Sequence, residues 1–193
     1  MRRSSLTNSA RASMATAMVL LGLSVGGAVH GESAKSFIPD PAAATPEYIL
    51  KAAFLYNFAQ FTAWPVRNDR LLQICILGRD PFGSALDALI GKSADGARIA
   101  VLRLRNVEEA LRSCQIIFVT DDEVDGFIAH IAAIVPRNGV LTIAEREGAA
   151  RAGIMIELTL SNSKIGFEFN QLSAERSGMT ISSKLLRLAR KVY

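Results

Sequence analysis

The chain has 193 residues and a formal net charge of +4, and half of its residues are hydrophobic. This length suits one domain with an additional segment. Residues 1–31 contain three arginines and no acidic residue, so their removal lowers the net charge from +4 to +1. A charge this small excludes a whole-protein electrostatic field that would recruit nucleic acid.

The first 31 residues have the organisation of a secretory signal peptide. A basic start is followed by an uncharged, mostly apolar stretch over 14–28, and small residues precede Glu32. The pattern predicts cleavage after Gly31 or Ala28, and hence a periplasmic protein. The alternative is an uncleaved anchor, although about fifteen apolar residues are short for a membrane span.

Residues 32–45 are predicted to be a linker, and one folded domain is predicted over 46–193. The domain opens with a helix expected over 46–64, because neither glycine nor proline interrupts this stretch after Pro46. Thr45 is placed to cap the helix, and Pro65 is placed to end it.

This helix is apolar on two sides. One side is expected to pack on the domain's own sheet: Tyr48, Ala52, Tyr56, Ala59 and Ala63. The other side carries Phe54, Phe58 and Phe61, beside a polar strip formed by Glu47, Lys51 and Thr62. Two interpretations of this phenylalanine stripe stay open: burial under the last helix, or a surface that binds a partner protein or a second copy of the chain. In the second interpretation Trp64 also belongs to the surface.

Four short apolar runs then alternate with helical segments, which predicts strands over 71–77, 98–104, 114–119 and 139–144. The helices between them are expected over 80–90, 107–112 and 123–135. Two further runs, 154–160 and 164–169, alternate in hydrophobicity around a short Asn/Ser link and predict a hairpin. The fold class is therefore α/β, with a mostly parallel sheet of about five to six strands, a C-terminal antiparallel hairpin and helices on both faces.

Two helices are expected after the hairpin. The first is a short helix over 171–177. The second begins at Ser182 or Ser183, and its apolar stripe is predicted to comprise Ile181, Leu185, Leu188 and Val192.

Catalytic motifs are weak in this sequence. Gly78 and Gly83 flank a loop that resembles a phosphate loop, but the lysine that such a loop needs is missing. His130 has no partner pattern and is expected to lie at the surface or its boundary. The acidic residues around Asp121 suit the start of a helix. We therefore expect no enzyme, cofactor or metal site.

The loops after the parallel strands are candidates for ligand binding, because α/β folds bind ligands at the carboxyl edge of the sheet. The loops concerned follow Leu77, Val119 and Ala144. Their candidate ligand residues are Asp80, Glu145, Arg146 and Arg151. A solvated charged loop is the alternative interpretation.

The two cysteines, Cys75 and Cys114, are expected to form a disulfide in an exported protein, with two buried free thiols as the alternative. A bridge would close a loop of about 40 residues and stabilise the fold by about 4 kcal/mol in the chain-entropy model. It would also require the first and third strands to be neighbours or nearly so, because bridged Cα atoms lie within about 7 Å.

Four segments in order resemble the YfiR-like family of bacterial periplasmic proteins. They are 48–65 (YILKAAFLYNFAQFTAWP), 74–83 (ICILGRDPFG), 166–170 (GFEFN) and 177–190 (SGMTISSKLLRLAR). The resemblance covers nearly all of the chain that follows the predicted signal peptide.

This resemblance implies a small periplasmic α/β protein, often a homodimer, with a disulfide where Cys75 and Cys114 stand. The family's namesake represses an inner-membrane diguanylate cyclase by binding its periplasmic sensor region, and so controls cyclic-di-GMP and biofilm formation. Redox state and an outer-membrane lipoprotein relieve that repression. The resemblance therefore implies a non-enzymatic regulator of a cyclase or another membrane sensor protein. A periplasmic module that binds a small molecule is the alternative.

The sequence departs from the family pattern in two places. Some members have a second cysteine pair near the loop after the fourth strand, whereas this chain has no cysteine there. Basic residues proposed to bind small ligands in the namesake are also absent, since Ala63 and Thr180 occupy those regions. The namesake's ligand pocket is therefore not carried over.

Overall fold

The structure is a computed structural model, and it describes residues 44–64, 70–133 and 139–193. The predicted signal peptide and nearly all of the predicted linker lie outside the described residues. The described residues all belong to one unit, residues 38–193. None of the helices in these described ranges combines the length and the hydropathy of a membrane span.

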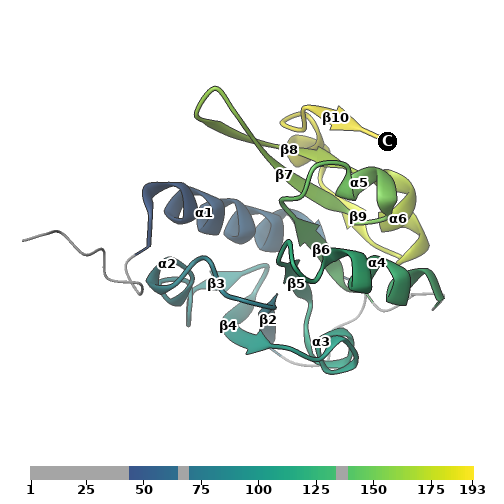
Figure 1. Cartoon of the computed structure of the whole chain (residues 1–193). Coiled ribbons are helices and arrows are strands. Elements are labelled where there is room, and N and C mark those ends of the chain that lie inside the picture. Colours follow the sequence, from purple (N-terminus) through teal and green to yellow (C-terminus); the bar gives the residue numbers. More distant parts are fainter. Residues whose placement is uncertain (1–43, 65–69, 134–138) are drawn as a thin grey trace, which may run out of the picture. The chain divides into compact units, whose positions relative to one another are not determined.

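An eight-stranded sheet forms the centre of the fold, in the order β10-β8-β7-β6-β5-β2-β4-β3 (Figure 1). Its parallel strands are β2 (Leu71–Leu77), β4 (Ala97–Leu104), β5 (Ile116–Val119), β6 (Leu141–Ala144) and β7 (Ile156–Ser161). Strand β8 (Lys164–Phe169) pairs antiparallel with β7. The predicted mostly parallel sheet with a C-terminal hairpin is confirmed. The strand count is higher than predicted because β3 (Ser93–Ala94) and β10 (Lys191–Val192) add two-residue edges.

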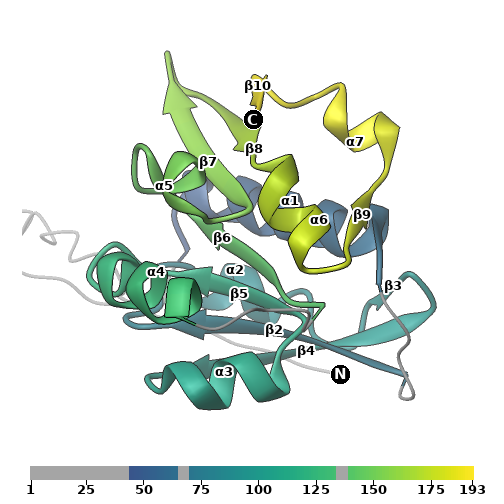
Figure 2. The ribbon, with the colours of Figure 1, turned by 90° about the vertical axis from the view of Figure 1, so that its right-hand side faces the viewer.

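Helices cover both faces of the sheet, as predicted (Figure 2). On one face, α1 (Pro46–Phe61) and α2 (Ser84–Asp87) pack over the larger apolar cluster, which includes Phe58, Phe82 and Phe118. On the other face, α3 (Val107–Ser113), α4 (Val124–Ala133) and α5 (Ala149–Ala152) cover a second cluster around Phe127. Since both faces are covered, the central strands can be continuously apolar.

Helix α1 ends at Phe61, three residues before the predicted end. Its start agrees with the prediction, because the Thr45 side chain accepts a hydrogen bond from the Tyr48 N–H. The end differs because Thr62 takes an extended backbone and opens β1 (Thr62–Ala63), which pairs antiparallel with β9 (Thr180–Ile181). A long-range strand pair thus ends the helix before Pro65 is reached.

The predicted C-terminal helix begins at Ser183, as expected, but its predicted extent to Val192 is wrong. Helix α6 (Gln171–Arg176) forms as expected, but α7 comprises only Ser183–Leu186, and the chain then turns into β10. Backbone hydrogen bonds to β8 replace helical ones, since the Arg190 N–H donates to the Phe167 carbonyl. Of the predicted stripe, Leu185 is buried, whereas Leu188 is 69% exposed.

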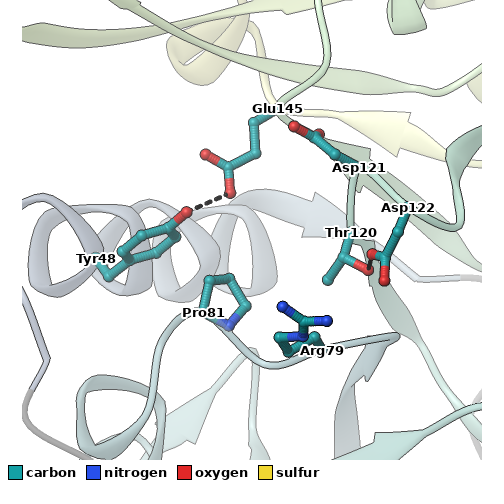
Figure 3. Close-up of a pocket in the computed structure, with 7 residues that line it drawn as sticks. All are labelled: Tyr48, Arg79, Pro81, Thr120, Asp121, Asp122 and Glu145. Carbon is teal, nitrogen blue, oxygen red and sulfur yellow. Dashed lines mark hydrogen bonds between the residues drawn. The ribbon is translucent and has the colours of Figure 1, made fainter. Parts of the chain in front are cut away.

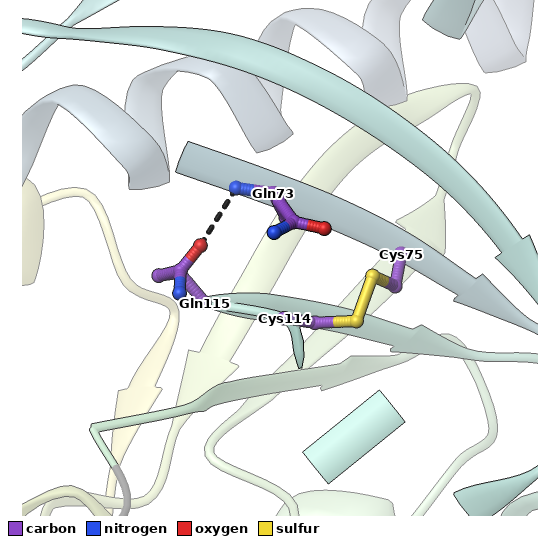
Figure 4. Close-up of a disulfide and its surroundings, with 4 residues drawn as sticks. All are labelled: Gln73, Cys75, Cys114 and Gln115. Atoms are coloured by element: carbon purple, nitrogen blue, oxygen red, sulfur yellow. Dashed lines mark hydrogen bonds between the residues drawn. A yellow bond between two sulfur atoms is a disulfide. The ribbon is translucent and has the colours of Figure 1, made fainter. Parts of the chain in front are cut away.

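Cys75 and Cys114 form a disulfide with a Cα–Cα distance of 6.0 Å (Figure 4). Cys75 lies on β2, and Cys114 is the C-cap residue of α3, two residues before β5 begins. Strands β2 and β5 are neighbours, as the predicted bridge required. The alternative of two free thiols is therefore wrong. Next to the bridge, the Gln115 side chain accepts a hydrogen bond from the Gln73 N–H at 2.7 Å.

We expect the double substitution Cys75→Ala/Cys114→Ala to lower the free energy of unfolding by about 2–4 kcal/mol, because the bridge closes a loop with a sequence separation of 39 residues. Urea denaturation of the variant and of the oxidised wild type measures the difference. Reduced wild-type protein serves as the control, since it lacks the bridge but keeps both side chains. Equal stabilities of the variant and the oxidised wild type would contradict the prediction.

Candidate functional site

A pocket of about 330 Å³ lies at the carboxyl edge of the parallel strands (Figure 3). The loops after β2, β5 and β6 line it together with the start of α1: Tyr48, Arg79, Pro81, Thr120, Asp121, Asp122 and Glu145. Strand β2 lies between β4 and β5, so the chain order changes direction beside it. Ligands of open α/β sheets bind at such a topological switch point. The three loops that the sequence singled out thus meet around one pocket.

Close packing of two loops forms one wall of this pocket. Gly78 follows β2 with φ +106°, and a Cβ at this position would lie 1.9 Å from Thr120 Oγ1. Only glycine therefore lets the two loops approach so closely. The Thr120 hydroxyl donates to Asp122 Oδ1 at 2.5 Å. This hydrogen bond is the main reason why the pKa of Asp122 is lowered, and the nearby charges of Arg79 and Arg105 act in the same direction.

The opposite wall is held by a buried lysine. Lys51 is 2% exposed, and its Nζ forms ion pairs with Glu47 and Glu145. The Tyr48 hydroxyl donates to Glu145 Oε1 at 3.0 Å. Burial and then the Glu145 carboxylate raise the pKa of Tyr48, because both disfavour the phenolate. Glu145 therefore joins the loop after β6 to the first two turns of α1.

This arrangement corrects the predicted polar strip of α1. Lys51 and Thr62 are both buried, each at 2% exposure, and Glu47 is partly exposed. A buried cation needs an acidic partner, and Glu145 from a distant loop supplies one. The Thr62 hydroxyl donates to the Phe58 carbonyl at 2.7 Å.

The other predicted ligand residues lie outside the pocket lining. Asp80 was expected to cap a helix, but α2 begins at Ser84; instead, Asp80 Oδ1 accepts from the Phe82 N–H and Asp80 Oδ2 pairs with Arg103 Nε at 2.6 Å. Arg146 pairs with Asp125.

Arg151 is an exposed residue on α5. Of the four predicted ligand residues, the structure therefore places Glu145 at the pocket.

The predicted phenylalanine stripe divides between core and surface. Phe58 is fully buried and packs edge-on against Phe167 at 5.2 Å, so it cannot contact a partner directly. Phe54 is half-buried against the same ring, whereas Phe61 is 39% exposed. Trp64 is half-buried, and its Nε1 donates to the Ala59 carbonyl. The assignment of Phe58 as a surface residue is corrected, while a partner-binding role for the others stays a prediction.

Sequence reasoning missed most of the individual pocket residues. The sequence pattern predicts Asp121 and Asp122 at the start of a helix and Tyr48 on the helix face that packs on the sheet. The i, i+4 spacing of Glu47 and Lys51 signals an ion pair near the start of α1, but it does not identify the residues that line the pocket. His130 lies away from the pocket lining, with Nδ1 3.8 Å from Glu108 Oε1. Among the described residues, no group of three metal-ligating side chains could hold a metal ion.

The fold and the pocket define a doubly wound α/β domain with a site at its switch point. The sequence profile of the YfiR/HmsC-like family matches residues 48–190, which is most of the chain. The chain therefore belongs to the YfiR/HmsC-like family. Members of this family are periplasmic, and the family points to regulation of cyclic-di-GMP signalling rather than to catalysis.

Two solved structures are also similar to this chain. One is a conserved domain protein from Vibrio cholerae O1 biovar El Tor, with 12% identity and a TM-score of 0.47, and the match covers 75% of this chain and 60% of that one. The other is the ABC domain in complex with L-Trp from Streptococcus pneumoniae, with 10% identity and a TM-score of 0.45. That match covers 63% of this chain and 55% of that one. The chain thus spans little more than half the length of either protein.

We expect Glu145→Gln to lower the free energy of unfolding by about 2 kcal/mol, because it leaves the buried Lys51 cation with Glu47 as its one remaining carboxylate. Lys51→Met should cost less, since it removes the charge together with the need for a partner. The double variant should therefore be as stable as Lys51→Met alone, and urea denaturation of all four proteins measures this coupling.

Arg146→Gln is the control for this cycle, because it breaks an exposed ion pair in the same loop and should leave stability unchanged. Additive losses in the double variant would show that Lys51 and Glu145 do not depend on each other.

Proposed function

We propose that this chain is a non-enzymatic periplasmic regulator. It binds the periplasmic sensor region of an inner-membrane diguanylate cyclase, represses the cyclase, and so lowers cyclic-di-GMP and biofilm formation. Family membership over residues 48–190 is the observation that carries this proposal. A cleaved signal peptide at residues 1–31 and a homodimeric state are parts of the same proposal, as is release by an outer-membrane lipoprotein.

The outer face of α1 supports the proposal by offering an apolar surface to a partner. Leu50 is 47% exposed and Phe61 is 39% exposed, and half-buried Phe54 lies between them along the helix. At 100° per residue these three side chains point within about 40° of one another. We call Leu50, Phe54 and Phe61 the outer ridge. In this proposal the outer ridge takes the place of the predicted phenylalanine stripe, because Leu50 is exposed to solvent and Phe58 is buried.

The outer ridge lies on a well-supported helix. Phe54 packs against Phe58 with ring centroids 6.0 Å apart and against Phe167 on β8 at 6.3 Å. At the far end of the helix, the Phe61 carbonyl accepts a hydrogen bond from the Ser182 N–H. Apolar side chains on a rigid element lose little conformational entropy when they bind, which suits a protein interface.

The variant Leu50→Glu/Phe61→Lys tests this surface. It keeps the net charge, and both replaced side chains are exposed, so the protein should fold. We expect repression to be lost: cells that contain the variant should have the same cyclic-di-GMP level as cells that lack the protein. Extracts analysed by mass spectrometry provide the measurement, and immunoblots show the amount of periplasmic protein.

Leu172→Glu is the control. Leu172 lies on α6, outside the outer ridge, and is 58% exposed, so this variant should still repress the cyclase. Capture of the wild type from its own membrane fraction, with and without reductant, then identifies the partner. Undiminished repression by a folded outer-ridge variant would remove this surface from the interface. Capture of no cyclase or other sensor protein would argue against the regulator itself.

A second candidate function is a periplasmic module that binds a small molecule. The observation in its favour is the pocket at the switch point, which is lined by the loops expected to bind ligands. A regulator and a ligand-binding module can also be combined in one protein, since the pocket and the outer ridge use different sides of α1.

Thermal unfolding in the presence of candidate ligands tests this module. A ligand present at 100 times its dissociation constant should raise the free energy of unfolding by about 2.7 kcal/mol. The signal should disappear in Gly78→Ala, because the new methyl group would collide with Thr120. A ligand that stabilises wild type and Gly78→Ala equally would bind elsewhere.

A further inference from the structure

The pocket has more hydrogen-bond acceptors than donors. Three carboxylates line it, those of Asp121, Asp122 and Glu145, whereas Arg79 is the one cationic residue among the seven lining residues. Asp121 is exposed and has no hydrogen bond or ion pair within the described part of the chain. Figure 3 shows its carboxylate on the same side of the pocket as that of Glu145. These two groups therefore form an acceptor surface.

The cations near the pocket offset only part of the negative charge of this surface. Lys51 is shared between Glu145 and Glu47, so two carboxylates compete for one ammonium group. The charge of Arg79 acts on Asp122, whose pKa it helps to lower. Arg146 is ion-paired with Asp125, and the charge of Asp121 acts on it as well.

The pKa of Tyr48 also reflects the negative charge around the pocket. Burial is the first cause of its raised pKa, and the charges of Glu145, Glu47 and Asp121 all raise it further. A ligand that carries a positive charge is the one that this field favours.

Two rings supply apolar surface to the pocket. The rings of Tyr48 and Pro81 line the side of the pocket opposite Thr120 and Asp122 (Figure 3). Aromatic rings attract cations over their faces, and Lys51 Nζ already lies 4.4 Å from the centroid of the Tyr48 ring. An alkyl chain can pack on such walls while its polar end reaches the acceptor surface. The volume of about 330 Å³ lies at the lower end of the range typical of small-ligand sites.

We propose that this pocket binds an organic cation: a primary ammonium or guanidinium group on a short alkyl chain. The N–H groups of the cation donate to Asp121 and Glu145, and the alkyl chain lies against Tyr48 and Pro81. The proposal rests on the second candidate function, because it names the ligand class of that pocket. The cation comes either from a free amine or from a lysine or arginine side chain of a partner protein.

Isothermal titration calorimetry on the chain that follows the predicted signal peptide tests the proposal. The probes are putrescine and N-acetyl-lysine methylamide. We expect at least one probe to bind and Asp121→Asn to weaken that binding about tenfold, because it removes one charged acceptor. Arg79→Gln should tighten binding, since it removes a like charge from the pocket. Binding of putrescine alone identifies a free amine as the ligand, and binding of the lysine derivative alone identifies a partner side chain.

Two controls separate recognition from general attraction. Glu109→Gln removes one exposed negative charge at the start of α3, at the same edge of the sheet but outside the pocket, and should leave the affinity unchanged. Tetramethylammonium has the same charge as a primary amine but no N–H donor, and it should bind at least tenfold more weakly.

Three results would overturn the proposal. The first is that neither probe binds at about 10 mM. The second is that Glu109→Gln weakens binding as much as Asp121→Asn does. The third is that Arg79→Gln weakens binding. In the last case the pocket takes an anion or a zwitterion. The second candidate function, a module that binds a small molecule, is still supported if another compound stabilises the wild type but not Gly78→Ala. It is rejected if no compound does so.

Discussion

Much of the described structure depends on how one buried ammonium group is neutralised. Lys51 belongs to a helix that packs on the sheet, yet its cation is almost completely shielded from water. A buried charge without a partner costs several kcal/mol, and Lys51 pairs with Glu47 on its own helix and with Glu145 from the loop after β6. This pairing fixes the start of α1 against the carboxyl edge of the sheet. It thereby places Tyr48 in the pocket and turns Leu50, two residues later, toward solvent. The two candidate sites thus share one helix and one supporting ion pair.

The strands could be predicted from the sequence because each is a short apolar run bounded by turn residues. Strand β2 has the predicted bounds, Leu71–Leu77, and β8 has the predicted bounds, Lys164–Phe169. The disulfide could be predicted as well, since two cysteines in an exported domain leave one possible pair. These features follow mainly from local pattern and from covalent chemistry, although β5 and β6 each begin two residues after the predicted start.

The ends of the helices and the directions of single side chains could not be predicted in the same way. Helix α1 stops where β9 pairs with the following residues, and the C-terminal segment becomes β10 because β8 offers it a free edge. Phe58 and Phe61 are three residues apart on one predicted stripe, yet one is in the core and the other is exposed. Likewise, the sequence predicted the three loops of the pocket but not the residues that line it. Asp80 pairs with Arg103 instead, whereas Asp121 lines the pocket and forms no hydrogen bond or ion pair within the described part of the chain.

The location of the disulfide determines how it can be reduced. Cys75 has no exposed surface and Cys114 is 3% exposed, so a thiolate cannot reach either sulfur while α3 and β2 are packed together. Thiol–disulfide exchange requires direct attack on a sulfur atom. Reduction therefore has to wait for this part of the domain to open, and its rate should level off as the concentration of reductant increases. The rate of reduction of the disulfide would then measure how often the domain opens. A partner that holds the domain closed would also keep the disulfide oxidised.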